Sequence, residues 1–260
     1  MSNDAFIARM RSVRHPITRS KYFHKFFFRN DVMHCLDCKG LTATVIGGII
    51  AKVVKNPAVA GTDPAERLQT VNREMKEFQK TQGNNSKMPR IRLADLKSDG
   101  WNMLSGVLVK AANTRQLAPF AEHLARTYLR DDPNIVEFIN QLNEVYASLY
   151  TAGMFLSNEE KERLRVAVAG MGLAHMLCRQ DARVANELSF PVRPKAHYAQ
   201  HIYHQGLLIN PRCVHCYHEE SLMGTLARIY KGTCSGPYRS TVQRSVCIKY
   251  LVQFVLWHDL

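Results

Sequence analysis

Acidic residues at two widely separated places in the chain could together hold a divalent metal ion. Asp31 lies three residues after the end of the aromatic run "KYFHKFFF" (21–28), and His34 is close enough to orient its carboxylate. Glu219 and Glu220 open a later helical pattern with basic residues nearby. Carboxylate oxygens are the ligands that Mg²⁺ prefers, and two such ions can activate a water or a 3′-hydroxyl for phosphoryl transfer. Surface acids without a catalytic role are the simpler interpretation of residues so far apart.

Three histidines form a second group. His197, His201 and His204 are spaced at i, i+4 and i+7, which places them on one face of a helix. A metal ion could use two of them, but the acid of the H-E-x-x-H arrangement is missing. With Lys195 preceding, the same face suits a phosphate or a carboxylate equally well. A half-buried, hydrogen-bonded face is the simplest alternative.

Two C-x-x-C pairs offer zinc-ligand chemistry. They comprise Cys35 with Cys38 and Cys213 with Cys216. A four-cysteine zinc site is not favoured, since the pairs lie far apart and no glycine-rich knuckle surrounds either. Cysteine also packs well as a small apolar residue, so buried thiols are the expected role. Zinc is therefore not favoured, and a zinc-stapled interaction module stays the weakest alternative.

The elements that must position these groups are mostly helices. The run 21–28 predicts a buried strand, and "GLTATVIGGIIAKVVKN" (40–56) predicts an apolar helix that ends before Pro57. Cap signals at Asp63-Pro64, Asp132-Pro133 and Ser157-x-x-Glu160 predict helices over 64–82, 133–151 and from 158 onward. The last of these should be central in its domain because it is apolar on most faces, and two helices are expected within 101–129.

The whole pattern predicts a mainly α protein with a few short strands, an α+β class. Three regions are expected: a core strand and helix at 1–56, a helical insertion at 57–190, and core helices at 191–260. With 260 residues, 46% of them hydrophobic, the chain can bury a sizeable core. Its longest apolar run is too short to span a bilayer, so no membrane partner is expected.

The charge of the chain is unevenly placed. The formal net charge is +13, and the basic surplus lies in 1–30 and 191–250. Such a surplus suits a polyanionic partner such as DNA, because neutralised phosphates release counterions. Solubility charge on exposed faces explains the composition equally well. No secretory signal pattern is present, so the seven cysteines are expected to be reduced thiols in the nucleus or cytoplasm.

The sequence motifs around the candidate acids resemble those of a known family. The order "D-V-M-H-x-x-x-x-x-G" (31–40), then "P-K-A-H-Y-x-x-H" (194–201), then "N-P-R-x-x-x-C-Y-x-x-E-x-L-M-G" (210–224) is similar to the carboxyl-terminal part of CACTA- and Plavaka-like DDE/D transposases. This resemblance implies an RNase H-like catalytic core interrupted by a large helical insertion. In an intact relative, that core would carry out metal-dependent DNA cleavage and strand transfer.

The resemblance also implies a role for each residue. Asp31 would be the second catalytic acid and Glu220 the third, both binding Mg²⁺ or Mn²⁺, with their carboxylates within about 8 Å of each other. The residues expected beside the acids are His34, His197, His201 and Glu219. The residues expected to contact DNA phosphates are Arg193, Lys195, Arg212, Arg228 and Lys231.

One acid of the family pattern has no counterpart in this sequence. The first catalytic Asp of the family lies on a strand well before the D-x-x-H segment, and only 30 residues precede Asp31 here. The chain is therefore expected to be a fragment or a degenerate derivative, incomplete as an enzyme by itself, and a homo-oligomer is compatible with that. The alternative is a non-catalytic basic helical protein that binds nucleic acid or an acidic partner.

Overall fold

The computed structural model of the chain describes residue 8 and residues 31–82, 88–206 and 209–214. The expected strand at 21–28 lies outside these residues. The longer α-helices are α2 (Leu41–Val53), α3 (Pro64–Thr81), α4 (Ala111–Tyr128), α5 (Pro133–Thr151) and α6 (Asn158–Val184). The shorter elements are η3 (Met33–Asp37), η4 (Leu93–Leu96), β1 (Lys97–Ser98), β2 (Trp101–Asn102), η5 (Gly106–Val109), α7 (Pro194–Gln200), α8 (Ile202–Gly206) and η6 (Pro211–Val214). The predicted mainly α fold is thus confirmed.

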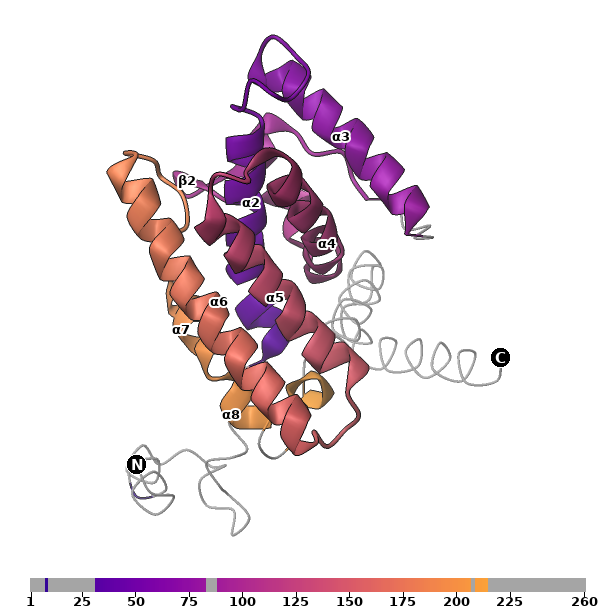
Figure 1. The fold of residues 1–260 in the computed structure, drawn as a ribbon, viewed down its shortest axis with the longest axis vertical. Coiled ribbons are helices and arrows are strands. Elements are labelled where there is room, and N and C mark those ends of the chain that lie inside the picture. The colour runs from indigo at the N-terminus through magenta and orange to yellow at the C-terminus, as the bar shows by residue number, and fades with distance from the viewer. Residues whose placement is uncertain (1–7, 9–30, 83–87, 207–208, 215–260) are drawn as a thin grey trace, which may run out of the picture. The chain divides into compact units, whose positions relative to one another are not determined.

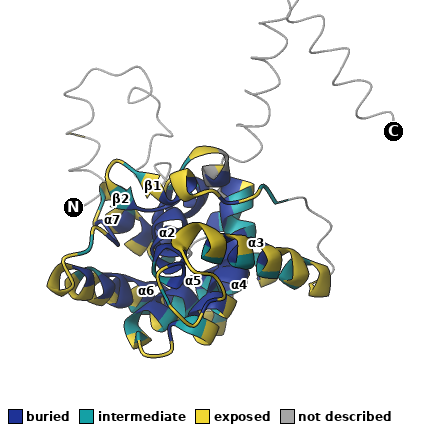
Figure 2. Ribbon diagram, turned by 90° about the horizontal axis from the view of Figure 1, so that it is seen from above, coloured by how far each residue is buried: buried dark blue, intermediate teal, exposed yellow. Residues whose placement is uncertain are grey.

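Helix α2 lies at the centre of the described helices. All of its residues except Lys52 are buried, because its sequence is apolar around the whole circumference. It packs against α4, α5 and the short π-helix η3. Figure 2 shows it as a buried element enclosed by the other helices. A helix that is hydrophobic on all sides must be surrounded, so its sequence accounts for its position.

Two glycines allow α2 to be enclosed this closely. A Cβ atom on Gly47 would lie 2.2 Å from the Cα of Met103, and one on Gly48 would lie 2.6 Å from the ring of Phe190. The segment that follows β2 therefore crosses α2 at backbone contact distance. The contact is completed by a hydrogen bond of 3.0 Å from the amide of Leu104 to the carbonyl of Ala43.

The helix starts predicted from capping signals are confirmed. Asp63 caps α3 by accepting from the amides of Ala65 and Glu66, and Ser157 and Glu160 form the reciprocal capping box of α6. Helix α5 begins at Pro133 and ends at Thr151, as the sequence indicates. These signals are local in sequence, which explains why they predict the boundaries well.

Helix α6 differs from the expectation that it would be central. It packs along α5, and residues such as Leu164, Val168 and Met171 are buried there. Its opposite face is exposed, with Leu173 64% and Val184 84% accessible. The prediction was wrong because α2 already occupies the middle of the bundle. Helix α6 is left on its outer side, where it forms the long helix in front of α7 in Figure 1.

The region 101–129 also differs from the prediction of two helices. It holds strand β2, the single turn η5 and one α-helix, α4, which contains Pro119. Strands β1 and β2 pair antiparallel, with Lys97 opposite Asn102 and Ser98 opposite Trp101. The two residues of the turn, Asp99 and Gly100, have positive φ angles of 52° and 79°, which suits a tight hairpin. Strand β2 and the single turn η5 occupy the part of this region that precedes α4, so only one α-helix forms.

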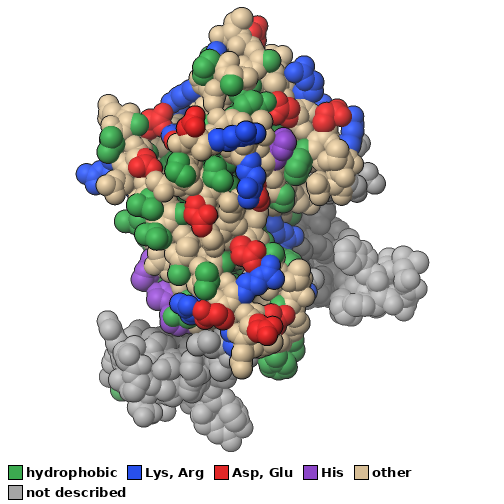
Figure 3. All heavy atoms as spheres, viewed as in Figure 1, with side chains coloured by type: hydrophobic (Ala, Val, Ile, Leu, Met, Phe, Trp, Pro, Cys, Tyr) green, Lys and Arg blue, Asp and Glu red, His purple; other side chains and the backbone are tan. Residues whose placement is uncertain are grey.

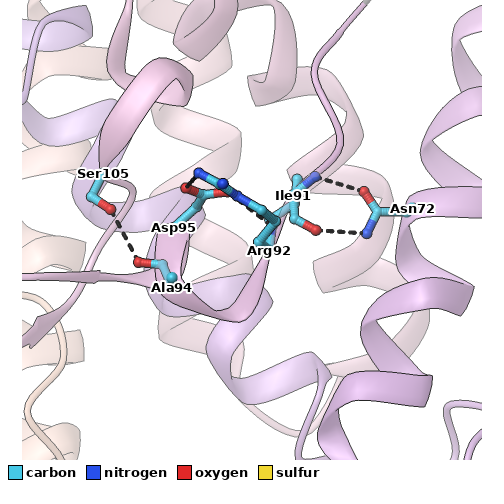
Figure 4. Close-up of polar contacts among 6 residues, drawn as sticks. All are labelled: Asn72, Ile91, Arg92, Ala94, Asp95 and Ser105. Atoms are coloured by element: carbon cyan, nitrogen blue, oxygen red, sulfur yellow. Dashed lines mark hydrogen bonds and ion pairs between the residues drawn. The ribbon is translucent and has the colours of Figure 1, made fainter.

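The connection between α3 and β1 is fixed by side chains that satisfy its backbone (Figure 4). Asn72 of α3 donates to the carbonyl of Ile91 at 2.9 Å and accepts from its amide at 2.8 Å. Asp95 is buried and forms an ion pair with Arg92 at 2.8 Å, which holds the pKa of this carboxyl below its ordinary value. The hydroxyl of Ser105 donates to the carbonyl of Ala94 at 3.3 Å.

Elements from all three expected regions share one hydrophobic core. Leu36 and Ile46 come from the first region, Leu124 and Phe138 from the second, and Ile202 from the third. The boundaries at 56 and 190 therefore do not divide this core, and whether 57–190 is an insertion stays a prediction. No helix among the described residues has the length and apolar character needed to cross a membrane.

Candidate functional site

Asp31 stands at the start of the turn that leads into η3. One carboxylate oxygen accepts from the amide of Met33 at 3.1 Å, and the other contacts Nδ1 of His34. The Asp31 carbonyl accepts from the amide of Cys35 at 2.9 Å. The side chain of Asp31 is 20% accessible and that of His34 43%, so the pair reaches solvent. His34 thus lies beside the acid.

Helix α7 packs directly against η3. Its buried residues are Ala196 and Ala199, and Pro194 opens it at the first helical position. The ammonium of Lys195 donates to the carbonyl of Cys38 at 2.5 Å, across 157 positions of sequence. The D-x-x-H segment and the P-K-A-H segment are therefore neighbours in space.

Charges from both segments act on the buried thiol of Cys35. Burial raises the pKa of Cys35 to about 11; the negative charge of Asp31 adds to this effect and the positive charge of Lys195 opposes it. In the absence of a metal ion, a thiol with this pKa is protonated near neutral pH. Cys213 is exposed, Cys178 is buried, and Cys216 lies outside the described residues.

The row of histidines extends away from this contact. His197 and His204 are exposed and His201 is half-buried. The Nε2 atoms of His197 and His201 are 3.1 Å apart. In Figure 3 histidine side chains gather at the edge of the molecule where Figure 1 places α7 and α8. The predicted common face of the three histidines is confirmed, although the helix is interrupted at His201.

The candidate DNA-contacting residues that can be described are engaged within the protein. Arg193 pairs with Asp99 at 3.0 Å, and Lys195 holds the carbonyl of Cys38. Arg212 donates to the carbonyl of Tyr150 at 2.9 Å and lies over its ring. The remaining predicted residues that lie outside the described part are Glu219, Glu220, Arg228 and Lys231. The proximity of Asp31 to Glu220 thus stays a prediction.

One polar cluster was missed by the sequence reasoning. Asp37 is fully buried and accepts a hydrogen bond from the hydroxyl of Tyr146, which lies 2.5 Å from the hydroxyl of Thr42. These residues join η3, α2 and α5. The available signal was an acid inside the otherwise apolar "CLDC" of 35–38, because a buried carboxylate requires a partner.

A second missed feature lies beside this cluster. The guanidinium of Arg115 lies 4.6 Å from the centre of the Tyr150 ring and bonds its hydroxyl, and that of Arg212 lies 5.2 Å from the same centre. Burial raises the pKa of Tyr150; Arg115 opposes this shift and Asp37 adds to it. The arrangement fixes η6 against α5 through a cation–π contact.

The described residues do not by themselves complete a metal site. They contain no group of three or more His, Cys, Asp or Glu side chains that could surround one ion. Asp31 offers a single carboxylate with accessible surface. A two-metal centre at this position would require further carboxylates from outside the described part of the chain, Glu220 among them.

Comparisons with models of protein families, with curated proteins and with solved structures gave no match for this chain.

Proposed function

We propose that this chain is derived from a DDE/D-type DNA transposase, with a partial RNase H-like core in which Asp31 is one of the acids. The observation that carries the proposal is the contact between η3 and α7. Two of the three motifs on which the resemblance rests are far apart in sequence, yet Lys195 bonds the backbone of the segment that Asp31 begins. A catalytic site assembled from distant motifs requires such a contact.

Asp31 has the properties of a carboxylate that could receive a metal ion. Its side chain is 20% accessible, and a carboxylate oxygen can accept more than one partner. A hydrogen bond from the Met33 amide and the contact with His34 orient it, as outer-shell partners of metal ligands do. When bound with Glu220, Mg²⁺ or Mn²⁺ would supply activation of a water or of a 3′-hydroxyl. The chain itself would orient the carboxylate and retain DNA through its basic surplus.

The alternative is a non-catalytic protein that binds nucleic acid or an acidic partner. It is favoured by the way Asp31 is used locally, since accepting the amide of Met33 is the ordinary role of an acid at the start of a helical turn. Here too the net charge of +13 would drive binding to a polyanion.

A DNA-nicking assay separates the two proposals. The full chain is incubated with labelled DNA and Mg²⁺ or Mn²⁺, in parallel with Asp31→Asn and Glu220→Gln. The matched control is Asp131→Asn, because Asp131 is an exposed acid in the connection between α4 and α5. We expect nicking to be lost in the first two variants and retained in the control. Equal nicking in all four proteins would refute the assigned roles.

A DNA-binding titration supplies the second arm of the test. The affinity for a fluorescent duplex is measured at several salt concentrations with the wild type, Arg228→Ala and Lys231→Ala. Each substitution removes one expected phosphate contact, so it should reduce the slope of log affinity against log salt concentration by about one. Salt-dependent binding without nicking by the wild type would favour the non-catalytic alternative over catalysis. Absence of both would refute the DNA-directed function.

A further inference from the structure

The described residue pair whose geometry points most directly to a ligand is His197 and His201. Their Nε2 atoms are 3.1 Å apart, and their rings are nearly perpendicular, at 88°, with centroids 4.6 Å apart. His197 is the fourth residue of α7, and His201 is its C-cap and still has helical angles. The i, i+4 spacing therefore persists although the helix is ending.

Two interactions bring imidazole nitrogens this close, a bent N–H···N hydrogen bond and a shared metal ion. In a head-on hydrogen bond, the centroids would be separated by the nitrogen distance plus two ring radii of about 1.2 Å, or about 5.5 Å in total. The observed 4.6 Å is shorter, so at least one nitrogen is directed away from the line that joins the two.

A shared metal ion accounts for the same distances. With metal–nitrogen bonds of about 2.05 Å, nitrogens 3.1 Å apart subtend an angle of about 98° at the ion. This angle lies between the octahedral and tetrahedral values. The ring centroids of such a chelate would be about 4.8 Å apart, close to the observed 4.6 Å.

The surroundings of the pair suit an ion that arrives from solvent. The buried face of α7 is provided by Ala196 and Ala199, so packing fixes the helix while His197 remains exposed. Both rings reach solvent, and imidazole nitrogen is a common metal ligand in proteins.

We propose that His197 and His201 chelate a divalent transition-metal ion, with its remaining positions open to water or to a donor from another molecule. Imidazole nitrogen selects ions such as Zn²⁺, Co²⁺, Ni²⁺ or Cu²⁺ over Mg²⁺. This site is distinct from the one proposed at Asp31, and it does not depend on transposase ancestry. His204 lies outside the chelate, because its ring is 5.7 Å from that of His201 and 3.8 Å from that of Tyr203.

The test is a Co²⁺ titration of the full-length, reduced chain, followed by visible and near-ultraviolet absorption. Binding to histidine gives d–d bands without the strong near-ultraviolet band that thiolates produce. We expect His197→Gln and His201→Gln each to weaken binding at least tenfold, with the double variant little weaker than either. The matched control, His204→Gln, should bind within threefold of the wild type. All these side chains reach solvent, and circular dichroism verifies folding of each variant.

The results that would overturn the proposal are equally specific. Wild-type affinity in His197→Gln or His201→Gln would show that the pair does not bind the ion. A thiolate band that persists in both variants would assign the metal to cysteines. A loss in His204→Gln as large as in the other two variants would exclude the two-imidazole chelate. Failure of the DNA assays would leave this result unaffected, so the two proposals fail separately.

Discussion

Replacing Tyr146 with phenylalanine should test how much of the fold depends on the buried polar cluster at Asp37. The hydroxyl of Tyr146 donates to the fully buried carboxyl group of Asp37 and lies 2.5 Å from the hydroxyl of Thr42. These contacts connect η3, which begins near Asp31, with α2 and α5. Phenylalanine keeps the ring and removes only the oxygen.

The expected loss in the free energy of unfolding follows from the burial of the Asp37 carboxyl group. A hydrogen bond to a carboxylate contributes about 1.5–3 kcal/mol, and a buried acceptor that loses its donor has no water to replace it. We expect Tyr146→Phe to reduce the free energy of unfolding by about 2–3 kcal/mol. For a compact unit of about 150–250 residues, this corresponds to a lowering of Tm of about 4–12 °C.

The assay is urea unfolding followed by circular dichroism, with Tyr128→Phe as the matched control. Tyr128 also donates to a carboxylate, at 2.6 Å from Glu74, but both residues are only half-buried. Water can replace that bond, so the control should cost less than about 1 kcal/mol. If Tyr146→Phe were as stable as the wild type, or if both variants cost the same, the assignment of Asp37 as a structural acid would be refuted.

Three further predictions concern close packing, a buried base and thiol reactivity. Gly47→Ala should lower the free energy of unfolding by about 3 kcal/mol, because the new methyl group would overlap the backbone of Met103 and Leu104. The control Gly153→Ala should be nearly neutral, because no atom lies within 4 Å of its new methyl group. Urea unfolding measures both. Burial lowers the pKa of His175. Below a pH of about 6.5 the unfolded chain therefore takes up a proton before the folded chain does, and the free energy of unfolding falls by at most about 1.4 kcal/mol per pH unit. His175→Gln should flatten this dependence, which urea unfolding at pH 5.5 and 8 would measure. Alkylation followed by mass spectrometry at pH 7.5 should modify the exposed Cys213 well before the buried Cys35, whose pKa is about 11; equal rates would contradict the burial of Cys35.

The elements that could be predicted from sequence are those whose signals are local. The caps at Asp63 and Ser157 and the bounds of α5 depend on residues within one helical turn. The hairpin turn at Asp99-Gly100 also has a local signal, but the apolar residues around it were assigned to a helix. The outer position of α6 could not be predicted, because it depends on α2 filling the centre.

The sequence indicated which residues could belong to the candidate site, but it did not indicate how the tertiary fold arranges them. The residues Asp31, His34 and Lys195 were identified from their order in the chain, and the structure places the segments that hold them side by side. Asp37 was missed because its hydrogen-bond partner, Tyr146, comes from 109 positions away. Such a pairing is a property of the tertiary fold, and neither segment alone indicates it.

The position of Lys195 limits what it can do in either proposed function. Its ammonium already has a hydrogen-bond partner in the carbonyl of Cys38, in a half-buried contact that fixes α7 against η3. To contact a DNA phosphate in place of that carbonyl, it would have to break this bond, which costs about 0.5–1.5 kcal/mol, and leave a backbone carbonyl without its donor. The described contact of Lys195 therefore positions the segment that Asp31 begins, and its contact with a DNA phosphate stays a prediction.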